Sequence, residues 1–195
     1  MHCSTACPSE LVRLNEISVA DFVIALGGLF EHSPWVAERA AVLRPFKTAR
    51  QLHDAMVAGV RSADEAQQLK LIRAHPELAG KEAAAGTLTD ASTSEQNRLG
   101  LTRLDAPTFN RLADLNARYR DTFGFPCIIA LRQHATVSSV LADFEHRLNS
   151  SRTLEIDRAL DEISVITRGR LAQYLGLPGD LLVGDEPVPS RQSHV

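Results

Sequence analysis

The sequence predicts an all-α fold, a compact single-domain bundle of about eight to nine helices over residues 1–179 with a tail at 180–195. Apolar residues recur at spacings of three and four along most of the chain, and capping residues precede these stretches. Sustained alternation of apolar and polar residues, which is typical of half-buried strands, is absent from the sequence. With 195 residues, of which 44% are hydrophobic, the chain can bury one sizeable core.

Capping and breaking residues predict four helices in the first half of the chain, beginning at Ser18, Ser33, Thr48 and Ser62. The first is expected to end at Gly27-Gly28, and the second must end before Pro45. The fourth begins with a capping box between Ser62 and Glu65. It is expected to end at His75, because Pro76 disfavours a helical conformation for the residue before it.

In the second half, the small and polar residues 81–89 are expected to form a loop. Further helices are predicted to begin at Ser92, Pro107, Thr136 and Thr153, the last and longest running to about Leu175. The short apolar segment Cys127–Leu131 lies between two of them, and its periodicity does not assign it to a helix or a strand.

Composition excludes several classes of protein. A net charge of -3 argues against a large nucleic-acid-binding surface, and no apolar run is long enough to span a bilayer. The N-terminus lacks the pattern of a secretory signal, so a cytoplasmic location is expected. Three cysteines, Cys3, Cys7 and Cys127, fit a reducing compartment. No Cys/His pair follows Cys3 and Cys7 at the spacing of a zinc site, so no metal is expected.

His75 is the first of three features that a purely structural interpretation leaves unexplained. At the end of a helix its imidazole would project from a fixed backbone, and imidazole suits proton transfer near neutral pH. A helix that merely ends in histidine explains the same residues.

The second feature is Glu95 beside Gln96, a carboxylate and an amide that could bind a polar substrate. Here a capping box from Ser92 to Glu95 is the alternative.

Arg170 is the third feature. Helical spacing places it on the apolar stripe of the last helix, with Ile156, Ala159, Ile163 and Ile166. Arginine is uncommon on such a face unless it meets an anion or extends its head group to solvent, and both alternatives stay open. Together, a titratable histidine, a carboxylate, an amide and a fixed cation suit a small anionic substrate and proton transfer.

A series of motifs resembles the OHCU (2-oxo-4-hydroxy-4-carboxy-5-ureidoimidazoline) decarboxylase family of uric acid degradation. The resemblance runs from about Leu14 to Leu175. Its motifs are Phe30-Glu31-His32-Ser33-Pro34-Trp35, Arg44-Pro45-Phe46, His75-Pro76-Glu77-Leu78-Ala79-Gly80, Leu88-Thr89, Ser92-x-x-Glu95-Gln96, Gly100-Leu101, Phe123-Gly124-Phe125-Pro126, Glu155, Ala159-Leu160, Glu162-Ile163 and Arg170-Leu171. In one departure, Cys127 stands where the family usually has an aromatic residue, which bears on the shape of the pocket.

The resemblance implies an all-helical, cofactor-free enzyme, usually a homodimer, that converts OHCU to (S)-allantoin and CO2. It implies that His75 is the catalytic acid, acting with Glu95 and Arg170, the arginine that meets a substrate oxygen. The substrate-contacting positions it implies are Pro76, Ser92, Glu95, Gln96, Arg170 and the backbone of Cys127, Ile128, Ile129, Ala130 and Leu131. Two alternatives stay open, a helical binding module without catalysis and a lyase or hydrolase acting on a related ureide.

Overall fold

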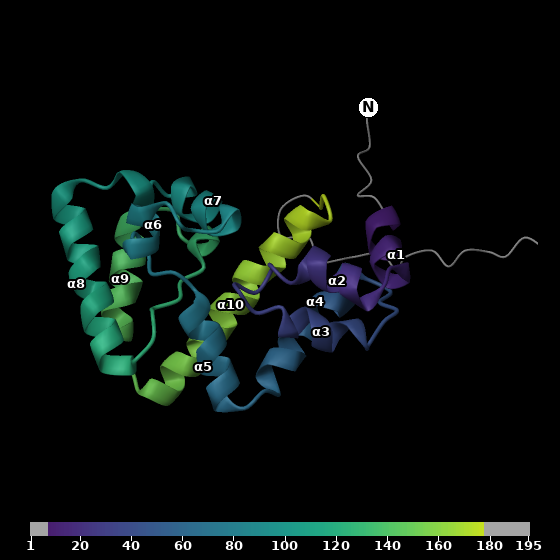
Figure 1. The fold of residues 1–195 in the computed structure, drawn as a ribbon. Helices are drawn as coiled ribbons and strands as arrows, with labels where there is room; N and C mark the ends of the chain where they lie inside the picture. The colour runs from purple at the N-terminus through teal and green to yellow at the C-terminus, as the bar shows by residue number, and fades with distance from the viewer. Residues whose placement is uncertain (1–7, 178–195) are drawn as a thin grey trace, which may run out of the picture. The chain divides into compact units, whose positions relative to one another are not determined.

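The computed structural model describes residues 8–177, and every regular element in that range is helical (Figure 1). The α-helices are α1 Pro8–Glu16, α2 Val19–Leu26, α3 Trp35–Ala41, α4 Ala49–Arg61, α5 Glu65–Ala74, α6 Lys81–Ala85, α7 Asp90–Arg98, α8 Ala106–Phe123, α9 Val137–Arg147 and α10 Arg152–Tyr174. Two short 3₁₀ helices, η1 Leu101–Arg103 and η2 Leu131–Gln133, complete the set. The all-α prediction is confirmed, and the predicted tail at 180–195 lies outside the described residues.

Contacts divide the chain into two compact units. Among the described residues, the first comprises 8–63 and 167–177, and the second comprises Asp64–Ile166. Helix α10 therefore belongs partly to each unit. The single domain expected for residues 1–179 stays a prediction, and each unit is described separately below.

The first unit contains α1 to α4 and the C-terminal part of α10 (Figure 1). Its core includes Phe22, Leu26, Leu52 and Met56, as the helical spacing predicts. Helix α1 escaped the sequence analysis, which placed the first helix at Ser18. The side chain of Arg44 explains how α1 ends, because its Nη1 donates to the carbonyl oxygens of Leu14 (3.0 Å) and Ile17 (2.6 Å).

The second unit contains α5 to α9 and the N-terminal part of α10, and α9 runs beside α8 (Figure 1). Aromatic side chains fill its centre. The ring of Tyr119 on α8 lies 4.5 Å from that of Phe123 and 5.5 Å from that of Phe144 on α9, measured between centroids. The tilted and edge-on geometries are those that aromatic pairs prefer, so these rings add to the cohesion of the unit.

Several predicted helix boundaries are confirmed by the caps. The hydroxyls of Ser18, Thr48 and Thr136 each accept the N–H three residues ahead, and Gly124 ends α8 in a left-handed conformation. Helix α5 instead begins after Asp64, whose carboxylate accepts the N–H of Gln67, so the predicted Ser62 capping box is wrong. Residues Lys81–Ala85 form the short helix α6, although a loop was expected there. These five residues are good helix formers, and Gly86 ends the helix at φ 66°.

Between residues 8 and 177, no helix is long and apolar enough to cross a membrane. The same range contains no group of three or more His, Cys, Asp or Glu side chains arranged to hold a metal ion.

Candidate active site

His75 is the C-cap residue of α5 and has an extended conformation (φ -78°, ψ 137°). The proline that follows it, Pro76, predicted this conformation because it disfavours a helical residue before it. The side chain is buried, with 5% of its surface exposed. Its Nδ1 lies 3.0 Å from the carbonyl oxygen of Leu71. A carbonyl can only accept a hydrogen bond, so Nδ1 carries the proton. The nitrogen that remains to take up or release a proton is therefore Nε2.

The loop after His75 is held in a tight conformation. Ala79 has a positive φ of 48°, which is uncommon for a residue with a side chain. A Cβ added at Gly80 would lie 2.7 Å from the Cβ of Glu77, so only glycine fits this position without a shift. The Nδ2 of Asn116 on α8 donates to the Leu78 carbonyl at 2.9 Å. These constraints hold the backbone of the loop that follows His75 in one conformation.

Gln96 connects α7 to this loop. Its Oε1 accepts the N–H of Ala79 at 2.9 Å, and its Nε2 approaches the Glu77 carbonyl at 3.4 Å. The amide of Gln96 thus supports the positive φ at Ala79. A role of Gln96 in binding substrate stays a prediction, and any such contact would be made alongside, or in exchange for, these two bonds.

Helix α7 begins earlier than the sequence analysis expected. Its N-cap is Thr89, whose hydroxyl accepts the N–H of Ser92 at 3.3 Å. Ser92 is therefore inside the first turn, and the interpretation of Ser92 and Glu95 as a capping box is wrong. Ser92 is buried and Glu95 is half-buried. This removes the structural alternative that the sequence offered for the carboxylate of Glu95.

The segment Cys127–Leu131 contacts α7, because the guanidinium of Arg98 donates to the carbonyl oxygen of Leu131. All five of its residues are buried. Burial raises the pKa of the Cys127 thiol, so this cysteine stays protonated and is not a nucleophile. The second unit thus brings α7 into contact with both the loop after His75 and the segment Cys127–Leu131.

Behind this segment lies a buried charged cluster that the sequence analysis missed. Arg147 on α9 and Glu155 on α10 are both 0% exposed, and they pair at 2.8 Å between Nε and Oε2. The hydroxyl of Tyr119 donates to the same Oε2 at 2.6 Å. Helical spacing could have found both: Arg147 follows Val140 and Phe144 on one stripe, and Glu155 precedes Ala159 by four.

Arg170 lies in the first unit, where its Nη1 pairs with the Glu31 carboxylate at 2.7 Å. Nη1 also donates to the Leu29 carbonyl at 3.3 Å. The two charged side chains are 6% and 2% exposed, so Arg170 does not extend to solvent. The buried ion pair, one of the alternatives for an arginine on an apolar stripe, is what the structure contains. A contact between Arg170 and substrate stays a prediction.

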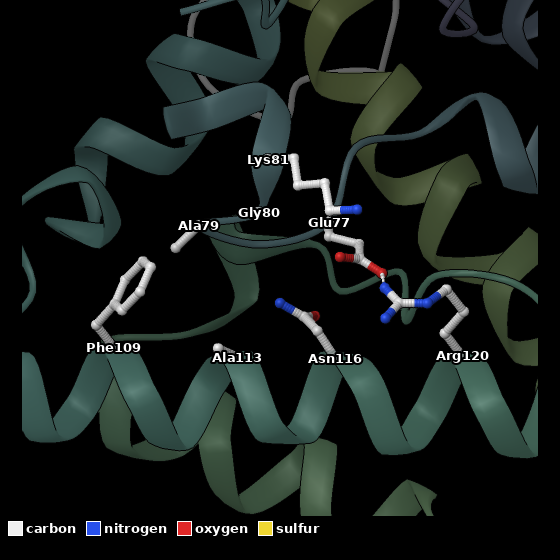
Figure 2. A pocket seen from close by; sticks show the side chains of 8 residues that line it. All are labelled: Glu77, Ala79, Gly80, Lys81, Phe109, Ala113, Asn116 and Arg120. Carbon is white, nitrogen blue, oxygen red and sulfur yellow. Dashed lines mark hydrogen bonds and ion pairs between the residues drawn. The ribbon is translucent and has the colours of Figure 1, made fainter. Parts of the chain in front are cut away.

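One pocket of the second unit, with a volume of about 250 Å³, lies between α8 and the loop after His75 (Figure 2). It is lined by Glu77, Ala79, Gly80, Lys81, Phe109, Ala113, Asn116 and Arg120. Figure 2 shows the four α8 side chains along one face of that helix, with Arg120 paired to Glu77. His75, Glu95 and Cys127–Leu131 are not among the residues that line it.

Comparisons with known proteins agree with the resemblance noted in the sequence. A sequence model of the OHCU decarboxylase family matches residues 15–172. A 2-oxo-4-hydroxy-4-carboxy-5-ureidoimidazoline decarboxylase of Haloferax volcanii is 38% identical over 163 residues, covering 84% of this chain and 94% of the relative. The corresponding mouse (Mus musculus) protein is 36% identical over 169 residues, covering 86% and 93%.

A solved structure of (S)-allantoin synthase has a similar fold, with a TM-score of 0.66 and 32% identity. The match covers 84% of this chain and 53% of that one, so the chain spans about half the length of the synthase.

Proposed function

The chain belongs to the OHCU decarboxylase family, and from this premise we propose that it converts OHCU to (S)-allantoin and CO2 in uric acid degradation. The observation that carries the proposal is the environment of His75. Its ring is buried at a helix end, and its Nδ1 is held by the Leu71 carbonyl. This arrangement leaves one nitrogen, Nε2, for proton transfer.

The reaction breaks one carbon–carbon bond. CO2 leaves from carbon 4, which also carries the hydroxyl group, and the electrons of the broken bond pass into the neighbouring ring C=N bond to give an enol between carbons 4 and 5. The hydroxyl then loses its proton as carbon 4 becomes the ring carbonyl, and a proton adds to one face of carbon 5, the ureido-bearing carbon, which sets the configuration of the product. The protein must therefore orient the carboxylate, stabilise the developing negative charge and deliver a proton to a single face.

In this proposal Nε2 of His75 first takes the proton of the substrate hydroxyl or directly protonates the carbon, or does both in turn. Glu95 accepts hydrogen bonds from ring or ureido N–H groups, since a carboxylate has only acceptors. Arg170 is assigned to the negative charge on substrate oxygens by its match to the family arginine. Its planar guanidinium, oriented by Glu31, is suited to two oxygens at once.

The same proposal includes a homodimeric state and a cytoplasmic location, which the family resemblance and the sequence composition support. Light scattering coupled to size-exclusion chromatography tests the first. A mass of twice 21.3 kDa is expected, and the monomer mass would contradict it.

The test of function uses fresh OHCU, generated by urate oxidase and its hydrolase partner, with circular dichroism of the product. The protein should accelerate CO2 release and give (S)-allantoin, whereas decay without enzyme gives the racemate. The variant His75→Asn is the informative comparison. Its amide nitrogen can still donate to the Leu71 carbonyl, but it lacks Nε2, so we expect turnover to fall by about 10²–10⁴ with an unchanged fold. Unaltered turnover in this variant would contradict the assignment.

A further inference from the structure

One peptide group in the loop after His75 is held from both sides by side-chain amides. Its carbonyl, that of Leu78, accepts from Nδ2 of Asn116 at 2.9 Å, and Figure 2 shows this side chain pointing from α8 toward the loop. Its N–H, that of Ala79, donates to Oε1 of Gln96 on α7 at 2.9 Å. The C=O and N–H of a planar trans peptide point in opposite directions. This peptide therefore cannot turn over without losing both hydrogen bonds.

The backbone directly after this carbonyl needs such support. Ala79 has a φ of 48°, and a residue with a side chain keeps such a conformation only where its surroundings hold it. The side chains of Asn116 and Gln96 are buried, at 6% and 3% exposure, so water does not compete for the two bonds. Between residues 8 and 177, Oδ1 of Asn116 has no hydrogen-bond partner. The Leu78 carbonyl is thus the group that this amide holds.

Helix α8 also holds the chain on both sides of His75. Before it, Nε of Arg73 at the end of α5 donates to the Gly124 carbonyl at 3.0 Å. After it, the carboxylate of Glu77 pairs with Arg120. Both contacts lie at the surface, where ion pairs and hydrogen bonds constrain a chain weakly. The buried amide of the same helix is therefore the firmest of the three constraints.

We propose that Asn116 is a positioning residue, which fixes His75 relative to Glu95. It acts through the Leu78–Ala79 peptide and, beyond it, through Gln96. His75 lies three residues before Leu78, and Glu95 directly precedes Gln96 on α7. The peptide thus connects the backbone of the proposed acid with the helix of the proposed substrate-binding carboxylate. The inference rests on the proposed function, and Asn116 itself does not need to touch the substrate.

Asn116→Leu removes the donor and keeps a side chain of similar size. A small displacement of a group that transfers a proton lowers the rate steeply. We therefore expect kcat for OHCU to fall by about tenfold and KM to change by less than about threefold, at a temperature where the variant is folded. Thr122→Val is the matched control. It removes a hydrogen bond that the exposed Thr122 hydroxyl donates to the Arg118 carbonyl within α8, and it should leave kcat unchanged.

Hydrogen exchange of the Ala79 amide provides a second readout, which needs no substrate. In the wild type this N–H is held by Gln96, so its exchange should be slow. Asn116→Ala removes the donor without adding bulk, and it serves where the larger leucine prevents folding. It frees the opposite side of the same peptide, so exchange at Ala79 should become about tenfold faster while amides in the middle of α8 keep their rates.

The two readouts separate a positioning role from a structural one. Wild-type kcat in Asn116→Leu, a rise in KM as large as the fall in kcat, or unchanged exchange at Ala79 in Asn116→Ala would each overturn the proposal. An equal loss of kcat in Thr122→Val would overturn it as well. Failure of the proposed function has a different signature, because the wild-type protein would then neither release CO2 from OHCU nor produce (S)-allantoin.

Discussion

A single carbonyl group, that of Leu71, decides which ring nitrogen of His75 can transfer a proton. Because the Leu71 oxygen accepts from Nδ1, the proton donor or acceptor is Nε2, and the ring cannot rotate without losing this bond. The position of His75 at a helix end was predictable from Pro76 alone. The identity of the carbonyl was not, because it depends on the side-chain rotamer adopted inside the folded unit.

Arg170 combines a structural bond with a proposed role in catalysis, and a paired substitution separates the two. Arg170→Met leaves the buried Glu31 carboxylate without its guanidinium partner, and breaking a buried ion pair costs about 3–5 kcal/mol. Adding Glu31→Gln removes the stranded charge, so we expect much of the free energy of unfolding to return. Turnover should stay low in the double variant, because the substrate still lacks its cation.

The measurements are chemical denaturation and OHCU turnover, both at a temperature where all variants are folded. The single variant Glu31→Gln is the control for the loss of the carboxylate. Recovery of turnover together with stability in the double variant would make Arg170 purely structural.

At the scale of elements, two residues near the start of α7 have different roles. Thr89 has a structural role, and Glu95 has a proposed functional role. Thr89 caps this helix, so Thr89→Ala should lower the free energy of unfolding by about 1 kcal/mol. Glu95 is not the N-cap residue, and Glu95→Gln should lower turnover far more than it lowers the free energy of unfolding. Urea unfolding and OHCU assays on both variants test this. A large loss of stability in Glu95→Gln would reinstate a structural role for this carboxylate.

The cluster that joins α8, α9 and α10 should make the protein sensitive to acid. Burial alone would raise the pKa of Glu155, but hydrogen bonds from Tyr119 and Arg147 outweigh it and hold the pKa below 4.5. Its stabilising contribution is therefore complete above that pH and is lost as the pH falls through the lower, folded-state value. Glu155→Gln should be less stable than wild type by about 3–5 kcal/mol at neutral pH, with a gap that shrinks in acid.

Glu162 provides a matched comparison with Glu155, because the pKa of its carboxyl is shifted in the opposite direction. Burial raises the pKa of its carboxyl, so the charged form destabilises the folded state at neutral pH. Replacing it with Gln should stabilise the protein at neutral pH, and this advantage should vanish below about pH 4.5, where both states of the wild type are protonated. Thermal melting of both variants from pH 4 to pH 8 measures the two slopes. Slopes of equal sign would contradict the assigned environments.

For the whole molecule, the sequence predicts the helices better than it predicts the side-chain contacts that hold the helices together. Periodicity and caps located most helices, since these signals are local. The short helix α6 was missed because its alanines resemble a small-residue loop, and α1 was missed although Leu11 and Leu14 recur at helical spacing and are buried. The buried partners of Arg147 and Arg170 come from distant parts of the chain, so spacing can flag the arginine but not its carboxylate.

The absence of a metal requirement is a prediction for the whole chain. Between residues 8 and 177, no cluster of ligating side chains suits a metal ion, and the proposed chemistry uses an imidazole, a guanidinium and backbone groups. Cys3 and Cys7 lie outside the described residues, and the sequence offers them no second pair. Prolonged treatment with EDTA should therefore leave OHCU turnover unchanged. The double variant Cys3→Ser/Cys7→Ser should behave in the same way, and loss of turnover restored by zinc in the wild type alone would identify these thiols as ligands.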